Sequence, residues 1–213
     1  MHRPRPTEPE LARPIDRALD QPGPDGARGG LCRRLFAWRK AWLLRRALRQ
    51  AGEPSLVLDL SHEAGMFWPL LAEYGNRVIL AAAAERDALS AVLAAQPAEL
   101  AARVKICEGR GEAIPLHDNA VDCIFAMGLL QRVADPQQRL AILRELHRVS
   151  RDTLIVSLQL EGNYPLRRQP KPNLISRGTI EEEIGRTGFE IVGRYSVWPG
   201  HSTAWIYVLR KED

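Results

Sequence analysis

Residues 111–157 read GEAIPLHDNAVDCIFAMGLLQRVADPQQRLAILRELHRVSRDTLIVS and contain a strand, a helix and the start of a second strand. The apolar run at 121–127 predicts a buried strand, and the amphipathic pattern at 136–151 predicts a helix. A further apolar run at 152–160 predicts the next strand. Because parallel strands need a long crossover connection, usually a helix, this stretch indicates an α/β protein with a parallel sheet.

The same alternation is found before this stretch. Apolar runs predict three further strands at residues 55–60, 77–83 and 103–108. Helical patterns separate them, at 64–75 and 85–96. Strand and helix therefore alternate from residue 55 onward, as in a doubly wound α/β sheet.

The end of the chain predicts a different connection. Thr179 and Glu182 have the spacing of a capping box, which predicts a helix ending at Gly188. Two apolar runs follow, at 189–198 and 202–211, and the turn between them is too short for a helix. They must pair as a hairpin. The predicted fold therefore has five parallel strands closed by a C-terminal β-hairpin, with helices on both faces.

The composition excludes few functions. The chain has 213 residues, of which 45% are hydrophobic and 26% charged, which suits one soluble domain with a flexible extension, either an enzyme or a binding module. No apolar run approaches the roughly 18 residues of a membrane span, and the N-terminus lacks the apolar core of a secretory signal. We therefore expect a cytoplasmic protein. Cys32, Cys107 and Cys123 are scattered, as are the five histidines, so neither a disulfide nor a metal site is predicted.

The positive charge is concentrated near the N-terminus. The net charge is +4, but residues 1–52 hold twelve Arg or Lys and five Asp or Glu, which gives +7 for that part and −3 for the rest. Residues 1–30 are rich in Pro, Gly and Arg and poor in large apolar side chains, so they are predicted to be a disordered tail. The folded domain is predicted over 31–213.

A basic amphipathic helix is predicted over residues 31–52. Leu31, Leu35, Trp38 and Trp42 lie on one stripe at helical spacing, with basic residues beside and behind it. One interpretation is a basic face for anionic lipid or nucleic acid. The other is a helix that docks on the domain through this stripe, and we favour it because charged helix faces are usually only solvated. A nucleic-acid partner is not expected.

The stretch at 111–157 also resembles a known family. The matching residues are Pro115, Asp118, Asn119, Asp122, Asp135, Pro136, Arg148 and Val149. Together with the terminal hairpin, they resemble the class I S-adenosylmethionine-dependent methyltransferases, particularly the group that includes ubiquinone and menaquinone methylating enzymes. The likeness covers roughly residues 55–210. It implies a Rossmann-like seven-stranded sheet and an S-adenosylmethionine pocket within a methyltransferase-like domain.

The resemblance places the first cofactor motif of the family, DxGxGxG, after the first strand. Asp59 and Gly65 match it, whereas Ser61 and Glu63 replace the first two glycines. Glycine lets the backbone turn tightly beside the ligand. Glu63 brings a carboxylate towards the methionine carboxylate, and two like charges about 5 Å apart at a dielectric near 20 repel by roughly 3 kcal/mol.

Two further cofactor anchors of the family are altered. The acid that binds the ribose hydroxyls falls at Ala83, and Glu85, two residues later, is expected to cap the next helix instead. The acid that binds the adenine amino group falls at Arg110, which only donates hydrogen bonds, and Glu112 is the nearest substitute. The resemblance therefore implies weak or absent S-adenosylmethionine binding.

The methyl acceptor is not identified by the sequence. Tyr164 follows the fifth predicted strand, where the acceptor pocket of the family usually opens, and it is equally interpreted as an ordinary loop residue. His201 lies in the hairpin turn and is the second candidate for the acceptor side, although we favour the interpretation that this turn only covers the core. No catalytic residue is assigned. The first hypothesis is methyl transfer to an O, N or C atom of a small or amphipathic acceptor. The alternative is a methyltransferase-fold protein that has lost the cofactor and acts as a protein partner or regulator. A dehydrogenase is disfavoured because no GxGxxG follows a strand.

Overall fold

The computed structural model describes residues 28–63, 65–74, 77–83, 86–161, 174–197 and 203–212, with the backbone alone for 28–33. The predicted tail over 1–30 lies outside the described residues except for its last three positions. These three residues form the beginning of a long helix, α3 (Arg28–Gln50). The predicted helix over 31–52 ends two residues early, at Gln50, and the chain then turns at Gly52, whose φ of +79° is left-handed and favours glycine.

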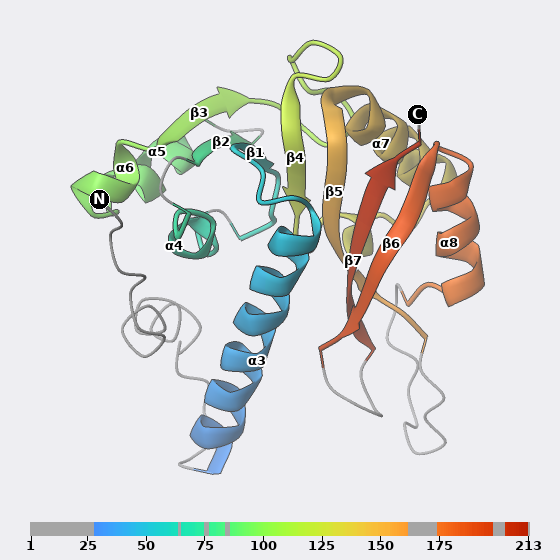
Figure 1. The fold of residues 1–213 in the computed structure, drawn as a ribbon, viewed down its shortest axis with the longest axis horizontal. Coiled ribbons are helices and arrows are strands. Elements are labelled where there is room, and N and C mark those ends of the chain that lie inside the picture. The colour runs from blue at the N-terminus through green and yellow to red at the C-terminus, as the bar shows by residue number, and fades with distance from the viewer. Residues whose placement is uncertain are drawn as a thin grey trace.

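A seven-stranded sheet forms the centre of the molecule (Figure 1). Its strands are β1 (Leu56–Asp59), β2 (Val78–Ala83), β3 (Val104–Glu108), β4 (Val121–Ala126), β5 (Ser150–Gln159), β6 (Phe189–Ser196) and β7 (Ala204–Lys211). Their order is β3-β2-β1-β4-β5-β7-β6. The first five strands are parallel, and β7 pairs antiparallel with both β5 and β6. The predicted fold, five parallel strands closed by a C-terminal hairpin, is confirmed.

Helices cover both faces of the sheet. Besides α3 they are α4 (Trp68–Leu71), α5 (Arg86–Ala94), α6 (Ala98–Ala101), the 3-10 turn η1 (Leu130–Arg132), α7 (Pro136–Val149) and α8 (Arg177–Gly185). Successive residues of β1 point to opposite faces: Val57 packs in the core under α3, α4 and α5, whereas Leu58 packs in the core under α7 and α8. The apolar runs predicted as buried strands are apolar because both sides of the sheet are covered.

One predicted helix start is wrong. Helix α8 begins at Arg177 and its N-cap is Ser176, so Thr179 does not cap it. The hydroxyl of Ser176 accepts from the backbone N–H of Thr179 over 3.2 Å. A serine three residues earlier provides the same kind of acceptor, and it adds almost a turn to the helix.

The orientation of α3 also differs from the prediction. Leu44 and Leu48, on the opposite face to the predicted stripe, are buried against the sheet. Leu35, Trp38 and Trp42 remain 49%, 55% and 39% exposed. The docking of α3 is therefore real, but the face predicted to dock points away. Small residues on the buried face, Ala37, Ala41, Ala47 and Ala51, let the helix approach the sheet closely where tryptophans would not fit.

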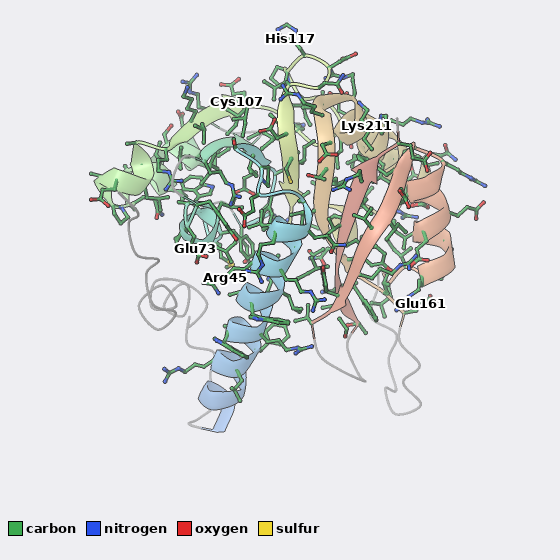
Figure 2. All side chains as sticks on the ribbon, viewed as in Figure 1. Arg45, Glu73, Cys107, His117, Glu161 and Lys211 are labelled. Atoms are coloured by element: carbon green, nitrogen blue, oxygen red, sulfur yellow. The ribbon has the colours of Figure 1, made fainter. Side chains whose placement is uncertain are left out.

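A bidentate ion pair fixes α3 to the segment after α4. Arg45 donates from Nη2 to Glu73 Oε1 over 2.6 Å and from Nε to Glu73 Oε2 over 2.8 Å. Figure 2 shows the two residues side by side between α3 and α4. A planar guanidinium that meets both carboxylate oxygens restricts the angle between the two elements as well as their distance.

Two arginines hold the segment between β1 and β2. Arg77 donates to the carbonyls of Pro54 and Leu71 over 2.6 and 2.9 Å. Arg103, which directly precedes β3, donates to the carbonyls of Ala72 and Tyr74. Side chains from outside α4 therefore satisfy the carbonyl groups that its last turn leaves without helical partners.

Several residues that carry the family resemblance have structural roles. Asp135 caps α7 by accepting from the N–H groups of its first turn. Asp122 accepts from the backbone N–H of Leu56 over 3.0 Å, and Arg148 bridges Asp118 and Glu145 at 2.8 Å each. The best-matching part of the sequence therefore specifies the fold and not the chemistry of a site.

Candidate cofactor and acceptor site

The loop after β1 continues along the end of β4. Leu60 N–H donates to Phe125 O and His62 N–H to Met127 O, both over 2.9 Å. Between them Met127 N–H donates to the buried hydroxyl of Ser61 over 3.3 Å. The serine that replaces the first motif glycine therefore fastens the loop to β4 at the carboxyl edge of the sheet, where α/β folds bind ligands.

Asp59, the last residue of β1, fixes the start of this loop through hydrogen bonds. Its Oδ1 accepts from Ser61 N–H and its Oδ2 from Trp68 Nε1, both over 2.9 Å, and it is 3% exposed. Burial raises the pKa of Asp59, and the two hydrogen bonds oppose that rise. Both carboxylate oxygens have protein partners, so Asp59 shapes the loop; its contact with the cofactor stays a prediction.

Gly65 is required by the fold. Its φ is +81°, and a Cβ there would lie 2.5 Å from Val92 Cγ1 on α5. Other residues rarely adopt this φ, and the side chain of a valine cannot swing away from such a clash. The one glycine of the motif that is retained therefore permits close packing of the loop on α5.

A first cavity of about 260 Å³ opens at the carboxyl ends of β1, β4 and β5. Its lining is largely apolar and comes from α3, the loops after β1 and β4, the end of β5 and the C-terminal hairpin. The lining residues are Phe36, Lys40, His62, Glu63, Phe67, Met127, Gly128, Gln131, Ser157, Leu158, Gln159, Val197, Ala204, Trp205 and Ile206. The polar side chains come from α3, from the loops after β1 and β4, and from β5, including its last residue. We name this the acceptor cavity.

A lysine from α3 lines the same cavity as Glu63, whose carboxylate was expected to repel the cofactor. Lys40 Nζ lies 4.9 Å from the centre of the Phe67 ring. Burial lowers the pKa of Lys40, and attraction to Glu63 opposes that change. The charge of Glu63 is therefore partly offset in the folded protein by a residue that was not predicted to be near it.

A second cavity, of about 440 Å³, lies between the loops after β1, β3 and β4. It is lined by His62, Arg110, Gly111, Glu112, Leu129, Arg132, Val133, Gln138 and Ile142. His62 lines this cavity and the acceptor cavity as well, and its Nδ1 accepts from Arg132 Nη1 over 2.7 Å. His62 therefore stands where the two cavities meet. We name this second one the adenine-side cavity.

Carboxylates surround the end of β3, but β2 ends without one. Ala83, the last residue of β2, pairs in register with Glu108, the last residue of β3. Glu108 and Glu112 line an open hollow of about 600 Å³ beside the adenine-side cavity. Glu112 also accepts a hydrogen bond from Gln138. The end of β2 therefore presents a methyl group where the resemblance places the ribose acceptor.

The structure brings together part of the predicted site. Arg110 and Glu112 share the adenine-side cavity, whereas Tyr164, His201 and Glu85 lie outside the described residues. Sequence reasoning missed Lys40 and His62, which line the acceptor cavity. Lys40 belongs to a helix far from the motifs in sequence, so no local pattern indicated it. His62 lies inside the altered cofactor motif, and this position alone could have indicated that it lines the site.

The described residues also bear on metal binding and on membrane insertion. Within them, no three or more His, Cys, Asp and Glu side chains are grouped so as to hold a metal ion. The helices of the described part of the chain include none that is both long enough and apolar enough to cross a bilayer.

Known protein families and solved structures resemble this chain in sequence and in fold. Residues 58–154 match the family model of a methyltransferase domain. No curated protein matches the chain by sequence. The match and the fold confirm the resemblance to the class I S-adenosylmethionine-dependent methyltransferase superfamily, and the narrower likeness to ubiquinone and menaquinone enzymes is not confirmed.

Solved structures share the fold at low identity. One is a possible exported protein from Bordetella parapertussis, with TM-score 0.66 and 17% identity, over 95% of this chain and 79% of that one. A second is a magnesium protoporphyrin IX methyltransferase from Synechocystis PCC 6803, with TM-score 0.64 and 13% identity, over 93% and 94%. A third is an S-adenosylmethionine-dependent methyltransferase from Aquifex aeolicus, with TM-score 0.59 and 19% identity, over 78% and 87%.

The residues present offer polar partners for the methionine and adenine ends of S-adenosylmethionine but no side-chain acceptor for its ribose. In the acceptor cavity, Lys40 is the cation that would bind the methionine carboxylate. In the adenine-side cavity, Glu112 supplies an acceptor for an amino group. At the ribose, Ala83 has no side-chain acceptor, and hydrogen bonds to a charged partner are worth about 1.5 to 3 kcal/mol each.

Proposed function

We propose that this protein transfers a methyl group from weakly bound S-adenosylmethionine to a small amphipathic acceptor. The observation that carries the proposal is the pair of cavities at the carboxyl edge of the sheet, which meet at His62. A ligand that spans both would place its adenine beside Glu112 and its methionine end beside Lys40. S-adenosylmethionine supplies the methyl group from its sulfonium.

The acceptor cavity supports the class of substrate. Its walls include Phe36, Phe67 and Trp205, which suit an apolar body, and its polar side includes Gln131 and Ser157, which suit a polar end. In-line methyl transfer depends mainly on positioning, so an apolar pocket with one polar side is sufficient to orient an acceptor. That Tyr164 and His201 contact the acceptor stays a prediction. The cytoplasmic location also stays a prediction.

Calorimetry with S-adenosylhomocysteine tests the cofactor half of the proposal. We expect a dissociation constant near millimolar, about −4 kcal/mol, because the ribose lacks its acceptor. A micromolar constant would show that the site is not weakened. Incubation with S-adenosylmethionine labelled on its methyl group, followed by mass spectrometry of amphipathic small molecules, tests the transfer itself.

A second function is favoured by one observation. The loop after β1 is fastened to β4 through Ser61 and His62, and the end of β2 carries Ala83, so two cofactor anchors are altered together. We propose as the alternative a catalytically inactive methyltransferase-fold protein that binds or regulates a protein partner. Absence of S-adenosylhomocysteine binding at millimolar concentration would favour this alternative.

A further inference from the structure

The large apolar side chains that the described residues expose lie together on one helix. They are Leu35, Phe36, Trp38 and Trp42, all on α3, with exposed fractions of 39% to 55%. Single exposed apolar residues are common, but a group of this size, half of it tryptophan, marks a surface that binds something. We name Leu35, Trp38 and Trp42, which follow one another at helical spacing, the tryptophan stripe.

The same helix is basic along its whole length. Residues 28–50 contain seven arginines and one lysine and no acidic residue, so the segment carries +8. Arg34 and Arg49 are exposed, and they flank the tryptophan stripe on its two sides along the helix axis. Arg46 lies over the Trp42 ring at 5.9 Å and is exposed as well. Cationic and apolar groups therefore share one face.

The two kinds of side chain are separated along the axis. At about 1.5 Å per residue, the tryptophan stripe spans roughly 10 Å and the exposed arginines after it roughly another 10 Å. The opposite face, with Leu44 and Leu48, is already buried on the sheet. Figure 1 shows that the first turns of α3 extend beyond the strands, so the sheet does not cover this end of the helix.

We propose that the exposed face of α3 binds an anionic phospholipid membrane. Tryptophan and leucine side chains enter the boundary between headgroups and acyl chains, where indole rings are favoured, and arginines pair with lipid phosphates. Nucleic acid would bind the arginines, but it has no apolar layer in which Leu35 could be buried. An anionic membrane carries negative charge over its whole surface, and residues 28–50 contain no acidic residue that it would repel. This inference does not depend on methyl transfer.

Flotation of the full chain with vesicles tests the proposal. We expect binding to phosphatidylcholine vesicles that contain about one third phosphatidylglycerol, at least about tenfold tighter than to phosphatidylcholine alone, and weaker at high salt. Tryptophan emission should shift to the blue on binding, because exposed indoles enter a less polar medium. Equal recovery with both vesicle types, or no recovery with either, would overturn the proposal.

Three double variants separate the contributions. Trp38→Ser with Trp42→Ser should abolish the blue shift and weaken binding about tenfold or more, since both side chains are exposed in the free protein. Arg34→Gln with Arg49→Gln should weaken binding by roughly fivefold per arginine and reduce its salt dependence. Arg144→Gln with Arg186→Gln removes the same charge from exposed positions on and after other helices, and should leave binding within about twofold.

Competing occupants of the face give different results. A second copy of the chain would appear as a dimer in light scattering that the double tryptophan variant abolishes. Nucleic acid would appear as tight binding of a single-stranded oligonucleotide that the double arginine variant weakens. Either result, without selective binding to anionic vesicles, would refute the membrane assignment. Thermal melts of each variant provide the check on folding, and the wild-type vesicle result stands even if a variant fails to fold.

Discussion

The indole nitrogen of Trp68 donates to Asp59 Oδ2 over 2.9 Å, and both side chains are buried. Asp59 begins the loop after β1, which we name the cofactor loop because it contains the altered cofactor motif. Trp68 on α4 thus binds one oxygen of Asp59, while Ser61 N–H binds the other. This pair links the first strand to the helix that follows it. The conformation of the loop therefore depends on a residue outside the cofactor motif.

Trp68→Phe should destabilise the protein by about 2 to 3 kcal/mol at neutral pH, because it removes a hydrogen bond to a buried carboxylate. Urea unfolding at several pH values measures the effect. A carboxyl whose folded pKa is raised above its ordinary 3.8 contributes stability that is complete below that value and is lost as pH rises through the folded pKa. Loss of the Trp68 donor raises the folded pKa further, so the deficit should be larger at pH 8 than at pH 4. A deficit that does not change with pH would mean that only packing was lost.

Ala83→Asp should restore the ribose acceptor at the end of β2. We expect S-adenosylhomocysteine to bind about tenfold more tightly, a gain of roughly 1.4 kcal/mol, measured by calorimetry. The control is Ala83→Asn, which has the same size but no charge and should gain less. If the Asp variant gains nothing, the ribose does not lie beside β2, and Glu108 becomes the candidate acceptor.

Lys40→Met and Glu63→Gly should change cofactor affinity in opposite directions. Removing the ammonium group should weaken S-adenosylhomocysteine binding about tenfold, whereas removing the carboxylate leaves Lys40 unopposed and should strengthen it. Lys40→Arg should behave like the wild type. Titrations at two salt concentrations measure both changes. Weakening by both variants would indicate that the pair supports the loop and does not meet the ligand.

Leu48→Ala and Trp42→Ala compare the two faces of α3. Leu48 is fully buried, so its truncation should cost about 2 to 5 kcal/mol and lower the melting temperature. Trp42 is exposed, so its truncation should change stability by only about 0.5 kcal/mol. Calorimetric melts of both variants provide the measurement. A large effect at Trp42 would show that the tryptophan stripe packs on some other part of the chain.

The strands were predictable because each is rich in apolar residues, and the central strands β1, β4 and β5 are largely buried. Their bounds differ from the prediction by at most two residues at each end. The face of α3 that packs on the sheet was not predictable. Two apolar rows fit the helical period, one through Trp38 and one through Leu44, and periodicity does not decide which meets the sheet. The start of α8 was missed because Ser176 and Thr179 are both acceptable N-caps, and only the path of the chain selects between them.

The candidate site was predictable where it follows a strand end and not where it depends on packing. Ala83 and Arg110 could be placed by counting from the strands. The approach of Lys40 to Glu63 depends on how α3 docks, which no local pattern contains. The hydrogen bond between Asp59 and Trp68 was not predictable for a similar reason, since the two residues are nine positions apart and meet only after α4 has packed.

The arginine contacts around α4 have a consequence for local opening. Arg77 stands next to β2 and Arg103 next to β3, yet both donate to carbonyls in the segment that follows the cofactor loop. To detach, that segment must give up bonds to two neighbouring strands, so it cannot fray as a separate unit. Its backbone amides should therefore exchange with deuterium together with those of β2 and β3, so the loop after β1 borders a segment whose opening is coupled to two strands.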